Sequence, residues 1–202
     1  MQELFTGLIN RHGRLPQLTL GLIIACVAVA LFTNLGADIP RLLPFLMSEY
    51  RGNQLSQLVQ IQQGEYWRLI TPILAHFGLL HLLFNMMWLW DLGGTIEVRW
   101  SPLRLALLTV VIAVSSNLAQ YLVSGALFGG MSGVVFGLLA YLYVIGRLQP
   151  QTGVFVPPQI MAFMLIWFAI CWTGLAGNIA NWAHLAGLVA GALLALLPVE
   201  NH

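Results

Sequence analysis

One serine and one histidine, distant in the sequence, are the residues whose types could do chemistry together. Ser132 carries the single hydroxyl of GGMSGVVFG (129–137), and His184 stands in NWAHLAG (181–187). An imidazole beside a serine hydroxyl can take the hydroxyl proton and later return it to a leaving amine. The pair therefore indicates nucleophilic cleavage of an acyl bond, if the fold brings the two side chains together.

Glycine spacing supports that contact. The sequence contains two pairs of glycines in which the second glycine follows four positions after the first: Gly133 with Gly137, and Gly187 with Gly191. Such pairs let two helices approach closely, and the second pair shares a helix face with His184. We expect helices beginning near 132 and 182 to pack together, with Ser132 within hydrogen-bonding reach of His184. Phe136, one turn further along, should face the imidazole ring.

A third polar cluster could complete the site. His81 and Asn85 in HFGLLHLLFN (76–85) are four residues apart and share one helix face. Their side chains and the backbone N–H of Ser132 are candidates for an oxyanion hole, where losing one donor costs about 10²–10³ in rate. Asp91 is the nearest intramembrane carboxylate, but it lies ten residues beyond His81, about 15 Å along a helix. We therefore expect a dyad rather than a triad.

Other chemistries fit less well. His76 and His81 are five residues apart and no H-E-x-x-H is present, so neither a zinc protease nor another metal site is predicted. Val134 takes the last position of the soluble hydrolases' G-x-S-x-G. Cys26 and Cys171 lie far apart in apolar stretches and are expected to be reduced and buried. No cofactor is indicated.

The composition places these residues in a membrane. The chain is 59% hydrophobic and 7% charged, with a mean hydropathy of +0.84, whereas soluble domains carry about 25% charged residues. A net charge of +1 without a basic face excludes a nucleic-acid partner. Apolar stretches lie at 18–32, 77–96, 102–123, 132–148, 157–175 and 182–198. Each approaches the ~20 residues that cross a bilayer.

We therefore predict an all-α membrane protein, a six-transmembrane-helix bundle with a long, partly helical first outer loop at about 37–76. Residues 1–17 are expected to form a short cytoplasmic segment, and 18–202 the membrane domain. The first apolar stretch is expected to be an uncleaved helix. With the N-terminus inside, five arginines face the cytoplasm and three lie outside, in agreement with the positive-inside rule. All three polar clusters then lie at the extracytoplasmic end.

The assembled pattern resembles the rhomboid intramembrane serine proteases, in their bacterial six-helix form. The resemblance rests on H-x4-H-x3-N at 76–85, G-x-S-G at 130–133 and A-H-x-x-G-x-x-x-G at 183–191. EYWRLITPILAH (65–76) is similar to the family's first-loop stretch, and Glu97 and Arg99 match its Glu-x-Arg.

The resemblance implies Ser132 as nucleophile, His184 as general base, and His81 and Asn85 in the oxyanion hole. It places His76, Gly130, Phe136 and Trp182 around the cavity; Phe136 stands where the family often has tyrosine. Transmembrane proteins are the implied substrates, cut in or near a membrane segment in the bacterial plasma membrane. The sequence carries no indication of oligomeric state.

Two other functions are open at this point. A catalytically inactive rhomboid-like protein would bind membrane clients without cutting them, although a pure binder needs neither Ser132 nor His184. A channel or transporter could use the same polar cavity, but the polar residues occupy only one half of the membrane depth and leave no visible path across.

Overall fold

The computed structural model describes residues 15–49, 58–175, 177 and 179–198. These residues form helices and connecting loops, and no strand occurs among them. Six helices of 14 to 23 residues make the body of the molecule. They are α2 (Gln17–Phe32), α5 (Leu79–Arg99), α6 (Pro102–Ser124), α7 (Ser132–Leu148), α8 (Pro158–Trp172) and α9 (Asn181–Leu194). Each begins within three residues of an apolar stretch predicted above.

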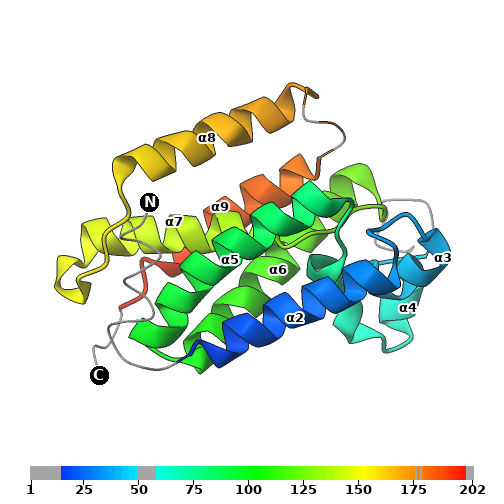
Figure 1. Ribbon diagram of the computed structural model, residues 1–202, viewed down its shortest axis with the longest axis horizontal. Coiled ribbons are helices and arrows are strands. Elements are labelled where there is room, and N and C mark those ends of the chain that lie inside the picture. The colour runs from blue at the N-terminus through cyan, green and yellow to red at the C-terminus, as the bar shows by residue number, and fades with distance from the viewer. Residues whose placement is uncertain (1–14, 50–57, 176, 178, 199–202) are drawn as a thin grey trace.

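Helices α6, α7 and α9 form the most closely packed part of the bundle. A Cβ atom built on Gly191 would lie 1.9 Å from the carbonyl oxygen of Gly137, and one on Gly187 would lie 2.0 Å from that of Gly133. Only glycine allows the backbones of α7 and α9 to come this close. Figure 1 shows the result: α7 and α9 run along each other, with α8 on one side and α2 on the other.

Helix α2 packs against α5, and one carboxylate joins their ends. Glu97 accepts the backbone N–H groups of Leu18 and Thr19 at 2.8 Å each, and the Thr19 hydroxyl at 2.7 Å. Pro16, at the N-cap of α2, makes no side-chain capping bond. Glu97 thus satisfies the open N–H groups of the first turn of α2 from 78 residues away.

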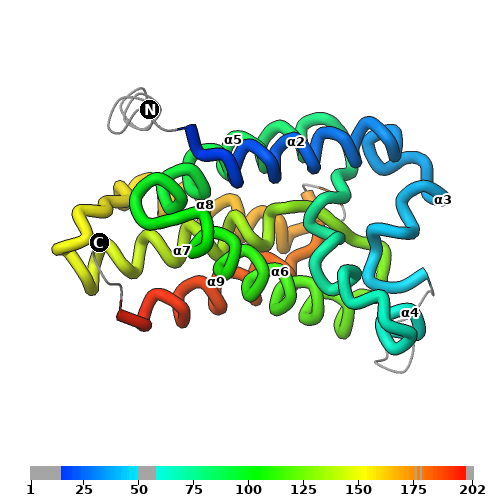
Figure 2. The backbone as a smooth tube through the Cα atoms, turned by 90° about the horizontal axis from the view of Figure 1, so that it is seen from below, coloured from blue at the N-terminus to red at the C-terminus, as the bar shows by residue number. Residues whose placement is uncertain are grey.

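The segment between α2 and α5 is long and partly helical. Its described part contains five short helices: α3 (Ile39–Leu42), η1 (Leu43–Phe45), α4 (Val59–Gln62), η3 (Tyr66–Leu69) and η4 (Thr71–Leu74). Figure 2 shows α3 and α4 gathered at one end of the long helices. Arg68 holds this segment together: it is 3% exposed, donates to the carbonyl oxygens of Leu43 and Leu46, and pairs with Glu49 and Glu65.

By length and composition, α6 is the one described helix that clearly qualifies as a membrane span, with a mean hydropathy of 1.7. Helix α5 is 21 residues long but carries Asp91, Glu97 and Arg99. The other four are apolar and have 14 to 17 residues. The finding is therefore an all-helical fold with one clear span. Of the expected cytoplasmic segment 1–17, residues 1–14 lie outside the described residues.

Candidate active site

The loop before α7 presents Ser132 at the first helical position. Gly130 has φ +120°, a backbone conformation that residues with a Cβ atom rarely adopt. Its N–H donates to the carbonyl oxygen of Pro72 at 2.9 Å. A Cβ on Gly129 would lie 2.7 Å from that of Ala75. The two glycines therefore let this loop lie directly on the segment before α5, and Ser132 remains half-buried at the start of α7.

Ser132 and His184 are in contact. The Nε2 atom of His184 lies 2.7 Å from the Oγ atom of Ser132, across 52 residues of sequence. His184 is in the first turn of α9, and the neighbouring contact of Gly133 with Gly187 sets the separation of the two helices at this level. The distance is that of a good hydrogen bond, so the serine hydroxyl can pass its proton to the imidazole without rearrangement.

An aromatic ring packs against the His184 ring. The Phe136 ring lies 4.7 Å from it, centroid to centroid, and Phe168 of α8 packs edge-on against Phe136. His184 is 3% exposed, and its Nδ1 atom has no hydrogen-bond partner among the described residues. Phe136 thus orients the ring by packing, while no described carboxylate binds Nδ1.

His81 points toward the serine loop. The ideal Cβ position on Gly130 lies 2.7 Å from the Nε2 atom of His81. The Nδ1 atom accepts a long bond from the N–H of Phe77, at 3.4 Å, which assigns the ring proton to Nε2 in the neutral form. His81 therefore presents an N–H donor beside Gly130, two residues from Ser132.

Asn85 lies one turn further along the same face of α5. Its Nδ2 atom donates to the carbonyl oxygen of His81 at 2.8 Å. An amide nitrogen has two hydrogens, so this bond leaves one donor for another acceptor. The side chain is 5% exposed.

His76 is fully buried and bonded on both sides of its ring. Its Nδ1 atom lies 3.1 Å from the carbonyl oxygen of Leu74, which can only accept, so Nδ1 carries the proton. Its Nε2 atom then accepts the N–H of Met131 at 3.4 Å. Burial lowers the pKa of His76 to about 4. The ring is therefore neutral near pH 7, as it must be for one nitrogen to donate and the other to accept. The structure thus ties His76 to the loop before Ser132.

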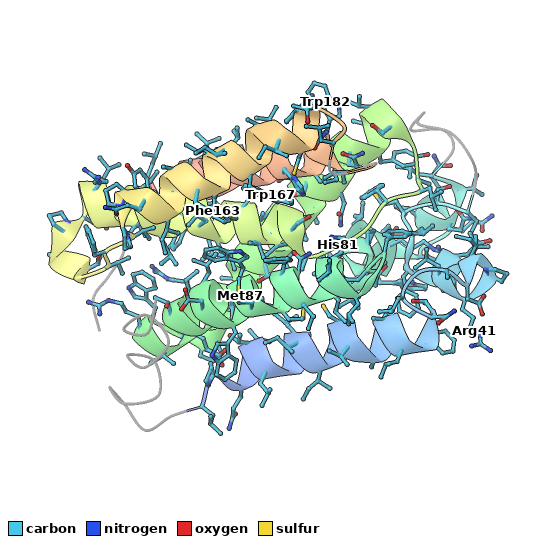
Figure 3. The ribbon with its side chains drawn as sticks, turned by 45° about the horizontal axis from the view of Figure 1, so that its top comes forward. Arg41, His81, Met87, Phe163, Trp167 and Trp182 are labelled. Carbon is cyan, nitrogen blue, oxygen red and sulfur yellow. The ribbon has the colours of Figure 1, made fainter. Side chains whose placement is uncertain are left out.

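Trp182 lies at the start of α9, and its ring meets that of Trp172 of α8 edge-on, with centroids 5.1 Å apart. Figure 3 shows Trp182 at the end of α9 nearest α8. The side chain also lines an open groove of about 360 Å³ between α6 and α9. Nearby, Asn181 donates to the carbonyl oxygen of Cys171, at the end of α8. These contacts join the end of α8 to the start of α9.

Neither cysteine is in a disulfide, and both are buried. Within the part of the chain that the structure describes, no group of three His, Cys, Asp or Glu side chains could hold a metal ion.

Comparison with known proteins identifies the family. The sequence model of the Rhomboid domain family matches residues 63–201 of this chain. The chain is 37% identical over 198 residues to the Rhomboid protease GlpG of Yersinia pestis (strain Pestoides F), covering 98% of this chain and 68% of that protein. It is 38% identical over 192 residues to the Rhomboid protease GlpG of Serratia proteamaculans (strain 568), covering 95% and 66%. The chain belongs to the rhomboid family. It is an intramembrane serine protease.

Sequence reasoning missed several residues that position this rhomboid site. Gln120 of α6, 5% exposed, accepts the N–H of Ala183 at 3.1 Å, directly beside His184. Asn117 of α6 donates to the carbonyl oxygen of Leu69 at 2.8 Å. Both are amides within an apolar stretch, and that placement was the available signal. Arg68 also acts through bonds to backbone carbonyl oxygens, which no side-chain pattern reveals.

Proposed function

We propose that Ser132 and His184 are the catalytic dyad of this rhomboid protease, and that it cleaves peptide bonds in or near the transmembrane segments of membrane proteins. The observation that carries the assignment is the 2.7 Å approach of Oγ to Nε2 between two mostly apolar helices. Polar side chains at membrane depth are costly and mark function by default.

The chemistry follows from this geometry. The Ser132 oxygen attacks the substrate carbonyl carbon while its proton moves to Nε2 of His184. The tetrahedral intermediate collapses, the C–N bond breaks, and His184 returns the proton to the departing amine. Water, deprotonated by the same imidazole, then hydrolyses the acyl-enzyme ester and restores the Ser132 hydroxyl.

Three donors would stabilise the oxyanion. They are the Nε2–H of His81, the second amide hydrogen of Asn85 and the backbone N–H of Ser132, which is at the positive end of α7. The tautomer assigned to His81 supports its part, because the acceptor Nδ1 is turned toward Phe77 and the donor toward Gly130.

The remaining site residues would hold this arrangement in place. His76 fixes the loop before Ser132 through Met131, and Gly130 provides the space that His81 needs. Phe136 supports the imidazole of His184 by ring packing, which needs no hydroxyl. Trp182 would form part of the rim through which a substrate reaches the dyad.

The membrane setting is part of the proposal. We place α2, α5, α6, α7, α8 and α9 across the bacterial plasma membrane, with the N-terminus in the cytoplasm and the dyad opening to the extracytoplasmic side. Helices of 14 to 17 residues are shorter than the ~20 needed for a typical bilayer. A locally thinned bilayer would accommodate them.

Fluorophosphonate labelling of the purified protein in detergent, with cleavage of a transmembrane substrate, tests the dyad. Wild type should be labelled, Ser132→Ala should not, and both Ser132→Ala and His184→Ala should lower kcat by at least about 10⁴-fold. Ser115→Ala is the matched control, because Ser115 is a half-buried serine of α6 whose hydroxyl donates to the carbonyl oxygen of Val111. Cleavage by Ser132→Ala at the wild-type rate would refute the assignment.

A further inference from the structure

The two ends of the helix bundle differ in how their charges are balanced. At the end that carries the dyad, Arg41 pairs with Asp38, and Arg68 pairs with Glu49 and Glu65. Figure 3 shows Arg41 at this end, beside the short helices. Each described arginine of this end therefore has a carboxylate partner.

At the opposite end, the described arginines have no such partners. Arg99 ends α5, Arg104 lies in the first turn of α6, and Arg147 lies in the last turn of α7. Among the described residues, none of the three has a carboxylate within ion-pair distance. Glu97 lies two residues before Arg99, but both of its carboxylate oxygens accept hydrogen bonds from N–H groups in the first turn of α2. Within the described part of the chain, these three arginines thus have no acidic partner.

Neutral groups hold the guanidinium of Arg104. The Arg104 guanidinium lies over the ring of Trp100, 5.5 Å from its centroid, and its Nη1 atom donates to the Tyr141 hydroxyl at 3.3 Å. Trp100 and Tyr141 themselves meet edge-on, with centroids 6.1 Å apart. These contacts fix the plane of the guanidinium but use one of its five N–H groups. Arg104 is half-buried, so part of the residue reaches the surface.

The surface next to Arg104 is apolar. Leu103 and Leu107 of α6 are 67% and 59% exposed, and Val111, one turn further, is 43% exposed. They lie on one face of the helix and lead from Arg104 along the bundle axis. An oriented cation at the head of an exposed apolar stripe matches the two parts of a phospholipid, a phosphate and an acyl chain.

We propose that Arg104, oriented by Trp100 and Tyr141, binds the phosphate of an anionic phospholipid whose acyl chain lies along Leu103, Leu107 and Val111. Arg99 and Arg147 add positive charge at the same end and favour an anionic over a zwitterionic headgroup. The inference depends on the proposed membrane placement but not on the catalytic dyad.

Native mass spectrometry of the full chain in detergent tests this site, with phosphatidylglycerol and phosphatidylcholine of identical acyl chains as probes. Wild type should bind phosphatidylglycerol at least about fivefold more tightly, since one arginine at a membrane surface contributes about a fivefold preference. Arg104→Gln should lower that preference about fivefold and leave only what Arg99 and Arg147 contribute. Tyr141→Phe, which removes one orienting bond, should lose about half of it on a logarithmic scale.

Arg41→Gln is the matched control. Arg41 also lies over an aromatic ring, that of Phe32 at 5.5 Å, but it is at the other end and has an acid partner. It should keep the wild-type preference. Equal binding of the two lipids by wild type, or equal losses in Arg41→Gln and Arg104→Gln, would overturn the proposal. So would inorganic phosphate that displaces the bound lipid at equal concentration, because the ligand would then be free phosphate.

Discussion

Replacing Gly187 by alanine tests how the helix packing sets the geometry of the dyad. The new Cβ would lie 2.0 Å from the carbonyl oxygen of Gly133, whereas real Cβ atoms do not approach within 3.0 Å. The backbones of α7 and α9 must therefore separate by about 1 Å. If the shift reaches the first turn of α9, the 2.7 Å distance between Ser132 and His184 grows to about 3.7 Å, beyond hydrogen-bond range.

A misplacement of this size costs about 10²-fold in rate, and overpacking costs about 1–3 kcal/mol of stability. We expect kcat to fall by about that factor, measured on a transmembrane substrate and expressed per folded enzyme, while KM changes little. Gly21→Ala is the control, because a Cβ at this α2 glycine meets nothing within 4 Å. A Gly187→Ala enzyme that keeps kcat within threefold of wild type would show that the glycine contact does not set the dyad distance.

Three further predictions concern the surroundings of the site. In Gly130→Ala the Cβ would lie 2.6 Å from the His81 ring, so the proposed oxyanion donor should be displaced and kcat should fall about 10²–10³-fold; an unchanged kcat would argue against that role. Glu97→Gln should lower the free energy of unfolding by about 1.5–3 kcal/mol, because a charged acceptor of three hydrogen bonds is lost, and denaturation in mixed micelles would measure it. The pKa of His76 is about 4 when folded and 6.5 as a free side chain. The unfolded chain thus binds more protons between these values, and stability should fall as the pH drops through this range, by at most about 3 kcal/mol; His76→Gln should lack this slope.

The sequence was most informative where function depends on helix faces. Spacings of three and four residues placed Ser132 opposite His184 and paired the glycines, because helical periodicity fixes which side chains share a face. The same reasoning set the starts of the long helices to within three residues. The ends were less accurate: α9 was expected to reach 198 but ends at Leu194.

What the sequence did not reveal are bonds between side chains and distant backbone groups. Glu97 binds the start of α2, and Gln120 binds Ala183, each across more than 60 residues. Such bonds follow no periodicity, since they depend on where two separate elements end in space. The sequence also does not give the direction of a side chain. The spacing predicted that Asn85 lies beside His81, but it did not predict the hydrogen bond from the Asn85 amide to the carbonyl oxygen of His81.

The Nδ1 atom of His184 has no hydrogen-bond partner among the described residues, and this has a consequence for the rate of the proposed reaction. In the proposed mechanism His184 gains a proton and becomes a cation that no described carboxylate neutralises. An isolated charge is expensive in such a buried site. Acylation would then have a higher barrier than in an enzyme with a third, acidic partner. A membrane helix that visits the site briefly would leave before it is cut, and only a segment that stays unwound there long enough would be hydrolysed. Slow chemistry would in this way discriminate between membrane helices that stay in the site and those that leave it quickly.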